Sequence, residues 1–126
     1  MIKQKTILLV EDNEVNMRLV ERTIKNPAYT IVSAGNGEEA LERAAQYKPD
    51  LIILDIQIPK MDGYAVARTL KADPALKHIP IIALTAHAMK GDEEKILAAG
   101  CDSYVSKPIE VSKFREKIND LLSDKS

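Results

Sequence analysis

Apolar and polar residues follow one another along this chain in two kinds of stretch, short apolar runs and longer amphipathic segments. Runs that predict β-strands occupy residues 6–10, 29–33, 51–54, 79–84 and 102–105. The runs "LIIL" and "IPIIAL" do not alternate with polar residues, which is typical of strands covered on both faces in a parallel sheet. The pattern therefore favours a sheet enclosed by helices.

The amphipathic segments predict helices over residues 38–47, 64–72, 93–98 and 111–122. A further helix precedes them, with Asn13 as its N-cap and its end before Pro27. Gly100 stands where the end of a helix favours a left-handed residue. Strands that alternate with helices predict a doubly wound α/β domain with five parallel strands, five helices and right-handed crossovers.

Composition indicates a single domain of ordinary globular character. The chain has 126 residues, of which 45% are hydrophobic and 29% charged, and its net charge is -1. Such a charge gives no electrostatic reason to expect binding to nucleic acid or to an anionic membrane. The chain ends with "LLSDKS", directly after the last predicted helix, so we expect residues 1–126 to form one domain with no output domain. The initiating Met1 and this clean end favour a whole protein.

The single cysteine and the amino-terminal residues bear on the cellular location. One Cys excludes an internal disulfide framework, and we expect Cys101 to be a small buried apolar residue. The start "MIKQKTILLV" has too short an apolar run for a signal peptide, and no segment is long enough to span a bilayer. The expected location is the cytoplasm.

Polar residues stand at the ends of four of the five predicted strands. Glu11 and Asp12 follow the first, Asp55 ends the third, Thr85 ends the fourth and Lys107 follows the fifth. Ligands of open parallel sheets bind outside the carboxyl ends of the strands, so we expect these residues on one rim. Three carboxylates repel one another unless a cation neutralises them, and hard oxygen ligands describe a Mg²⁺ site.

A plainer interpretation is that Asp and Asn follow strands because they cap the next helix. It explains Asn13 well and any single acid adequately. It does not explain why acids, a hydroxyl group and an amine share one rim.

Four stretches carry a resemblance to a known family, namely "LLVEDNEVN", "PDLIILDIQIPKMDGYAVARTLK", "IPIIALTAHAMKGDEEK" and "AAGCDSYVSKPI". Over essentially its whole length the chain resembles the receiver domains of bacterial two-component response regulators. It is most similar in character to DivK-like single-domain regulators and to the receiver domains of hybrid sensor kinases. The resemblance implies a flavodoxin-like fold with strand order 2-1-3-4-5.

The resemblance also implies the chemistry of the strand ends. Asp55 matches the aspartate that accepts a phosphoryl group. Asp12 and Glu11 match the acidic pair that holds Mg²⁺, Asp12 directly and Glu11 through water, and the backbone carbonyl of Gln57 is a further expected ligand. Mn²⁺ is the alternative metal. The Glu-Asp pair replaces the commoner Asp-Asp, which adds one methylene to the first acid.

Further positions correspond to the switch of the family. Thr85 matches the switch hydroxyl, Tyr104 the switch aromatic and Lys107 the phosphate-binding amine, with a cis peptide bond before Pro108. Gln57 and His87 flank the reactive strand ends and are expected to control how water reaches the phosphorus. These positions complete the candidate site.

The implied function is a phosphorylation switch. The expected donor is a phosphohistidine of a histidine kinase or phosphotransfer protein, and the expected output is contact with an unidentified protein partner by a monomer or weak dimer. Outside its own phosphorylation and dephosphorylation no enzymatic activity is expected.

Two alternatives remain at this point. A pseudo-receiver would bind partners without phosphorylation, but Asp55, Thr85 and Lys107 argue against it. An enzyme or flavin carrier would need a Ser-, Thr- or Gly-rich phosphate loop after the first strand, where this chain has Glu-Asp.

Overall fold

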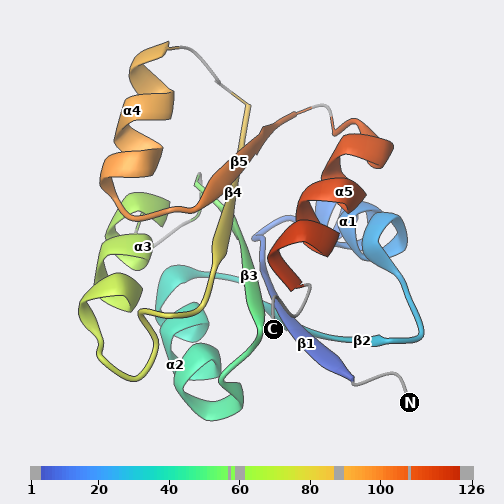
Figure 1. The fold of residues 1–126 in the computed structure, drawn as a ribbon, viewed down its shortest axis with the longest axis horizontal. Helices are drawn as coiled ribbons and strands as arrows, with labels where there is room; N and C mark the ends of the chain where they lie inside the picture. The colour runs from blue at the N-terminus through green and yellow to red at the C-terminus, as the bar shows by residue number, and fades with distance from the viewer. Residues whose placement is uncertain (1–3, 57, 59–61, 87–89, 108, 123–126) are drawn as a thin grey trace.

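A parallel sheet of five strands forms the centre of the computed structural model, which describes residues 4–56, 58, 62–86, 90–107 and 109–122. The strand order is β2-β1-β3-β4-β5, so the implied flavodoxin-like fold is confirmed (Figure 1). The strands are β1 (Lys5–Val10), β2 (Tyr29–Ala34), β3 (Leu51–Asp55), β4 (Ile81–Thr85) and β5 (Ser103–Ser106). All neighbouring strands run parallel.

Helices cover both faces of this sheet. They are α1 (Glu14–Ile24), α2 (Gly37–Tyr47), α3 (Gly63–Ala72), α4 (Lys90–Ala98) and α5 (Val111–Leu122). Figure 1 shows α2, α3 and α4 on one side of the sheet and α1 and α5 on the other. The doubly wound arrangement predicted from the alternating pattern is therefore confirmed.

The central strands are buried on both faces, which accounts for their unbroken apolar sequence. Every residue of β3 and β4 is buried. Because side chains alternate along a strand, Ile52 and Leu54 pack into the core under α2, α3 and α4, while Leu51 and Ile53 pack into the core under α1 and α5. One short run thus contributes to two core layers.

Three helices begin with a side-chain cap. Asn13 Oδ1 accepts a hydrogen bond from Asn16 N at 3.1 Å, and Asn36 Oδ1 accepts from Glu39 N at 3.0 Å. Asp62 likewise caps α3. The cap at Asn13 fixes the start of α1 directly after β1, which orients the intervening acids.

Proline shifts the start of one strand from its predicted position. The apolar run at residues 79–84 predicts a strand from residue 79, but β4 begins at Ile81. Pro80 has no N–H group to donate to a ladder, although its carbonyl accepts from Ile52 N at 3.0 Å. Ile79 is buried in the approach to the strand.

The carboxyl end of the fourth helix and the single cysteine match their predictions, whereas this helix begins at Lys90, three residues before its predicted start. Gly100 has φ of 101°, the left-handed conformation expected after α4. A Cβ on this glycine would lie 2.6 Å from Lys71 Cγ, so space as well as conformation favours glycine. Cys101 is buried, as expected.

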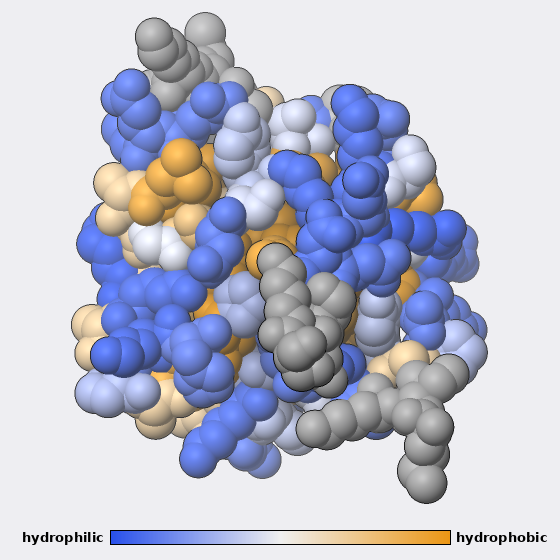
Figure 2. All heavy atoms as spheres, in the orientation of Figure 1, coloured by the Kyte–Doolittle hydropathy of each residue, from blue (hydrophilic) through white to orange (hydrophobic). Residues whose placement is uncertain are grey.

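The surface is mainly polar. In the view of Figure 2 hydrophilic residues cover most of this face, and apolar residues show through in smaller patches. Within the described part of the chain, none of the helices has both the length and the apolar character needed to cross a membrane.

Candidate functional site

Three acids meet at the carboxyl ends of β1 and β3. Glu11 and Asp55 are buried, with 1% and 3% of their surfaces exposed, whereas Asp12 is exposed. One carboxylate oxygen from each residue lies within 4.8 Å of the others. Glu11 and Asp55 are 44 positions apart in the sequence. The fold brings them together because β1 and β3 are neighbours in the sheet.

Lys107 supplies a positive charge to this cluster. Its Nζ donates a hydrogen bond to Asp55 Oδ2 at 2.9 Å and lies 3.5 Å from Glu11 Oε2. Its backbone N donates to Thr85 O at 2.8 Å, which fixes the residue beside the end of β4. One ammonium group thus faces two buried carboxylates.

The pKa values of Glu11 and Lys107 both reflect the crowding of negative charge in this cluster. Burial, together with the neighbouring carboxylate of Asp55, raises the pKa of Glu11 to about 7; the Asn13 N–H and Lys107 act in the opposite direction. Burial lowers the pKa of Lys107, but the hydrogen bond and negative charge of Asp55 and the charge of Glu11 together raise it by more. The pKa of Lys107 is therefore raised overall. The site favours an ammonium and disfavours an additional negative charge.

A buried oxygen in this cluster indicates space for a cation. Glu11 Oε1 accepts a hydrogen bond from Asn13 N at 3.2 Å. Among the buried side-chain polar atoms of the described residues, Glu11 Oε2 is the one with no hydrogen-bond partner. Such an oxygen gains from a cation. Mg²⁺ prefers hard oxygen ligands and retains water, and exposed Asp12 leaves the cluster open to water. The residues present therefore fit Mg²⁺.

Glycine at the start of α3 keeps the backbone of this cluster in place. A Cβ on Gly63 would lie 2.5 Å from Ile56 Cα and 3.0 Å from Asp55 O. Any larger residue would push against the backbone of Asp55. The sequence indicates only a turn at Asp62-Gly63, so this positioning contact was not foreseen.

Thr85 and Tyr104 lie on neighbouring strands next to the acids. Thr85 is buried at the end of β4, one residue past Leu84, which pairs with Asp55. Tyr104 on β5 pairs with Ala83, and its hydroxyl donates to Glu93 Oε1 on α4.

A lysine on α5 contacts the same tyrosine. Lys117 Nζ donates to Tyr104 O at 2.7 Å and lies 5.3 Å from the ring centroid. Sequence reasoning missed both Glu93 and Lys117. The run "GDEEK" offers several acids on a short helix, and nothing in the sequence shows which of them faces β5.

Some predicted positions lie outside the described residues. They are the carbonyl ligand at Gln57, the tuning residues Gln57 and His87, and the cis bond before Pro108. These stay predictions.

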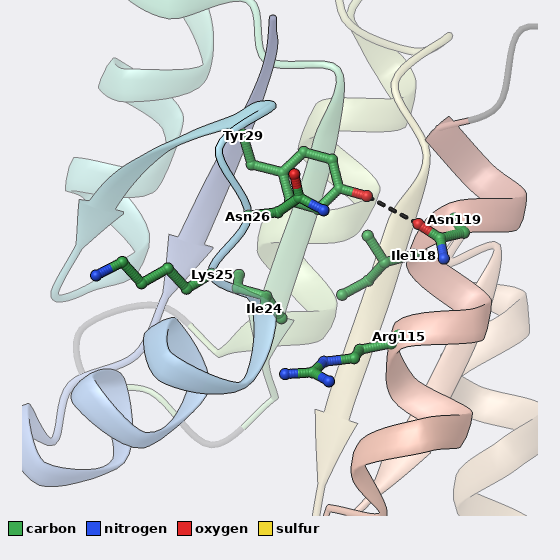
Figure 3. Close-up of a pocket in the computed structure, with 7 residues that line it drawn as sticks. All are labelled: Ile24, Lys25, Asn26, Tyr29, Arg115, Ile118 and Asn119. Atoms are coloured by element: carbon green, nitrogen blue, oxygen red, sulfur yellow. Dashed lines mark hydrogen bonds between the residues drawn. The ribbon is translucent and has the colours of Figure 1, made fainter. Parts of the chain in front are cut away.

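A pocket of about 230 Å³ lies away from this cluster, where α1 ends and β2 begins. Figure 3 shows Tyr29 pointing toward Asn119 of α5, with Lys25 extending away from the other lining residues. The Tyr29 hydroxyl donates to Asn119 Oδ1 at 2.9 Å, and Arg115 Nε donates to Thr23 O at 2.8 Å. These contacts join α5 to α1 and β2, so we interpret the pocket as structural.

Fold and site together define a class of protein, and the comparison with protein families agrees. The family described as the response regulator receiver domain matches residues 7–119. The chain belongs to this family and is a two-component response regulator.

Individual relatives narrow the description. Over 120 residues the chain is 49% identical to the polar-differentiation response regulator DivK of Brucella anthropi, covering 95% of this chain and 98% of that protein. DivK of Brucella ovis is 48% identical over the same shares. The predicted resemblance to DivK-like regulators is confirmed.

Solved structures agree with the fold. A response regulator from Chloroflexus aurantiacus superposes with a TM-score of 0.91 at 29% identity, covering 97% of this chain and all of that one (100%). The receiver domain of a sensor histidine kinase from Pseudomonas aeruginosa has a TM-score of 0.87 at 33% identity, covering 96% of this chain and 99% of that one. That protein was solved with a magnesium ion coordinated in its active-site cleft.

Proposed function

We propose that Asp55 accepts a phosphoryl group from a phosphohistidine of a histidine kinase or phosphotransfer protein, and that the modified chain then changes its protein contacts. One observation carries the assignment: Asp55 is the buried acid of the cluster that a lysine holds directly, at 2.9 Å. On this proposal the protein is a signalling switch and catalyses only its own phosphorylation and dephosphorylation.

The chemistry requires few groups. An Asp55 carboxylate oxygen forms a bond to phosphorus as the bond from phosphorus to the histidine nitrogen breaks, and that nitrogen keeps the electron pair. Such transfers need in-line positioning and neutralisation of charge more than covalent assistance. Lys107, already within reach of Asp55, would hold one phosphoryl oxygen, and the Thr85 hydroxyl would donate a hydrogen bond to another.

The acids of the cluster would hold the metal. Asp12, Glu11 and Asp55 are the described candidates, with the carbonyl of Gln57 as a predicted further ligand. Bound Mg²⁺, or Mn²⁺ in its place, would neutralise negative charge on the phosphoryl oxygens.

The groove beside the cluster is where we propose the phosphohistidine partner docks. It has a volume of about 340 Å³, is lined by Leu19, Val20 and Ile109, and reaches Glu11 and Lys107. On the same helix, Val15 and Leu19 are 67% and 56% exposed. An apolar surface that runs into the acceptor site suits a partner that must bring its imidazole to Asp55.

We also propose the kinds of partner and the cellular location. The net charge of -1 supports a protein that contacts neither nucleic acid nor membrane lipid. We propose that it works in the cytoplasm, as a monomer or weak dimer, on a downstream protein that the sequence does not identify.

Replacement of the acceptor tests the assignment. Asp55→Asn should take up no phosphate from a small acyl-phosphate donor in Mg²⁺, because an amide is a poor nucleophile, while its circular dichroism stays that of the wild type. A phosphate-specific gel stain measures the uptake, and Asp120→Asn, an exposed position on α5, is the matched control.

Two results would contradict the proposal. Uptake by Asp55→Asn at the wild-type rate would exclude Asp55 as the acceptor. A wild-type protein that takes up no phosphate yet captures the same partners with and without the donor would favour the pseudo-receiver.

A further inference from the structure

We propose that Glu93 holds Tyr104 in its resting position and thereby sets how readily this receiver switches. The inference rests on the proposed function and deepens it, because it names the contact that opposes activation. The observation behind it is a hydrogen bond from the Tyr104 hydroxyl to the Glu93 carboxylate, which joins β5 to α4.

Tyr104 is held from two helices at once. Glu93 of α4 accepts from its hydroxyl, and Lys117 of α5 donates to its backbone carbonyl at 2.7 Å. Lys117 also donates to the side-chain Oγ of Ser103 at 3.2 Å, so one lysine of α5 holds the Tyr104 carbonyl and the neighbouring serine. The strand is fixed at this point, and the movement left to Tyr104 is rotation of its side chain.

Rotation of the Tyr104 ring breaks the contact with Glu93. A hydrogen bond from a hydroxyl to a carboxylate is charge-assisted and stronger than one between neutral groups. Both side chains are partly buried, so water competes with the contact less than at a fully exposed site. The contact therefore adds to the free energy needed to move the ring.

The position of Glu93 connects this contact to Thr85. Thr85 ends β4, and α4 is the next element along the chain, with Glu93 in its first turn. When Thr85 moves toward a phosphoryl group, the chain between β4 and α4 must follow. Glu93 anchors the tyrosine to that same helix end, so it opposes rearrangement of both switch residues.

A plainer interpretation is a surface hydrogen bond with no bearing on the switch. On that view its removal changes stability slightly and ligand binding not at all. On ours, removal destabilises the resting state alone, and by linkage a ligand that favours the activated state then binds more tightly. Binding of such a ligand distinguishes the two.

The experiment measures the affinity for beryllofluoride in Mg²⁺ by calorimetry. We expect Glu93→Ala to bind about fivefold more tightly than the wild type, at the low end of typical coupling between sites. The matched control is Glu94→Ala, which removes the same charge from an exposed neighbour on the same helix and should leave the affinity unchanged. Alanine preserves helix propensity at both positions.

A double-mutant cycle with Tyr104→Phe tests whether the tyrosine hydroxyl carries the effect. Phenylalanine cannot donate the hydrogen bond, so Tyr104→Phe should also tighten binding, and adding Glu93→Ala to it should change nothing further. Tyr104→Phe gives an independent test should Glu93→Ala prove poorly folded.

The outcomes separate this inference from the function on which it rests. Suppose that the wild type binds beryllofluoride. If Glu93→Ala does not raise the affinity, or raises it equally in the Tyr104→Phe background, the Glu93 contact is not a restraint on the switch. The proposed function is unaffected by that result. Wild-type protein that binds no beryllofluoride overturns the proposed function and this inference with it.

Discussion

The two ends of the sheet differ in how far their charged side chains are paired within the chain. At the amino ends of the strands two acids and a lysine have partners within the chain. Lys71 Nζ lies 3.0 Å from Asp102 Oδ2, which also accepts from Ile81 N at 2.8 Å, and Asp50 Oδ2 accepts from Thr6 N at 2.8 Å. At the carboxyl ends three carboxylates lie together, and the Lys107 ammonium pairs with two of them, Glu11 and Asp55.

This difference shows what each end contributes. Groups satisfied within the chain gain nothing from a ligand, so the amino end adds stability. The carboxyl end has an excess of negative charge and a buried oxygen without a hydrogen bond, so it gains from a cation. Changes at the amino end should therefore alter stability, and changes at the carboxyl end should alter the binding of a cation.

The largest expected effect is a pH dependence caused by Glu11. Its pKa is raised from 4.5 to about 7 in the folded protein, so within this range folded Glu11 keeps a proton that the unfolded chain has released. The free energy of unfolding should therefore fall as pH rises from 4.5 to about 7, by on the order of 3 kcal/mol in total, and then level off.

Urea unfolding of the metal-free protein across this range measures the effect. Glu11→Gln has no carboxyl group to titrate at this position and serves as the comparison. If the difference between wild type and Glu11→Gln is constant with pH, the strain ascribed to this carboxyl group is absent.

Stabilisation by Mg²⁺ is next in size. A metal that binds only the folded state adds about 2.7 kcal/mol to the free energy of unfolding at a hundredfold excess over the dissociation constant. Asp12→Ala should remove most of this gain and Glu11→Ala less. Lys107→Ala should bind Mg²⁺ at least as tightly, because the ammonium pairs with the same carboxylates.

Melting curves with and without Mg²⁺ give the comparison. Lys107→Ala should nevertheless show no full conformational response to beryllofluoride, because the phosphoryl group loses its cation. If the melting temperature of the wild type does not change with Mg²⁺, there is no metal site at this end of the sheet.

At the amino end we expect the reverse, a loss of stability without a loss of binding. Lys71 Nζ donates to the carbonyls of Lys77 and Ile79 as well as to Asp102. Lys71→Met should lower the free energy of unfolding by about 2 kcal/mol, because these acceptors lose a charged donor. Calorimetry should find its Mg²⁺ affinity unchanged; a weakened affinity would show that the two ends are coupled.

The smallest effect is expected at the pocket between α1 and α5. Tyr29→Phe removes one partly exposed hydrogen bond to Asn119 and should cost about 0.5–1 kcal/mol. Phosphate uptake from the small donor should equal that of the wild type. Slower uptake would give this pocket a part in the function that its structure does not indicate.

The fold was readable from the sequence because the central strands are apolar up to their last residue and α1, α2, α3 and α5 have a clear amphipathic pattern. The convergence of Glu11 and Asp55 followed from one rule about parallel sheets. These inferences depend on local pattern and topology. Sequence contains both directly, and the ends of the elements moved by at most three residues, the most at α4, which begins at Lys90 rather than at residue 93.

Contacts between side chains on different elements were not readable. The bond from Tyr104 to Glu93 spans 11 residues and depends on how α4 is rotated about its axis, because Glu94 is exposed on the same turn. The upward shift in the pKa of Glu11 depends on burial and on the orientation of Asp55. Packing determines these features, and a single sequence does not specify it.

The strand order also governs when the site acquires its charges during synthesis. The acids are the residue pair after β1 and the last residue of β3, whereas Lys107 follows Asp55 by 52 residues, directly after the last strand. A ribosome therefore delivers the three carboxylates before the ammonium group that pairs with two of them. Repulsion among them opposes early closure of the amino-terminal half until β5 docks on β4. Completion of the fold and neutralisation of the site are, for the nascent chain, one event.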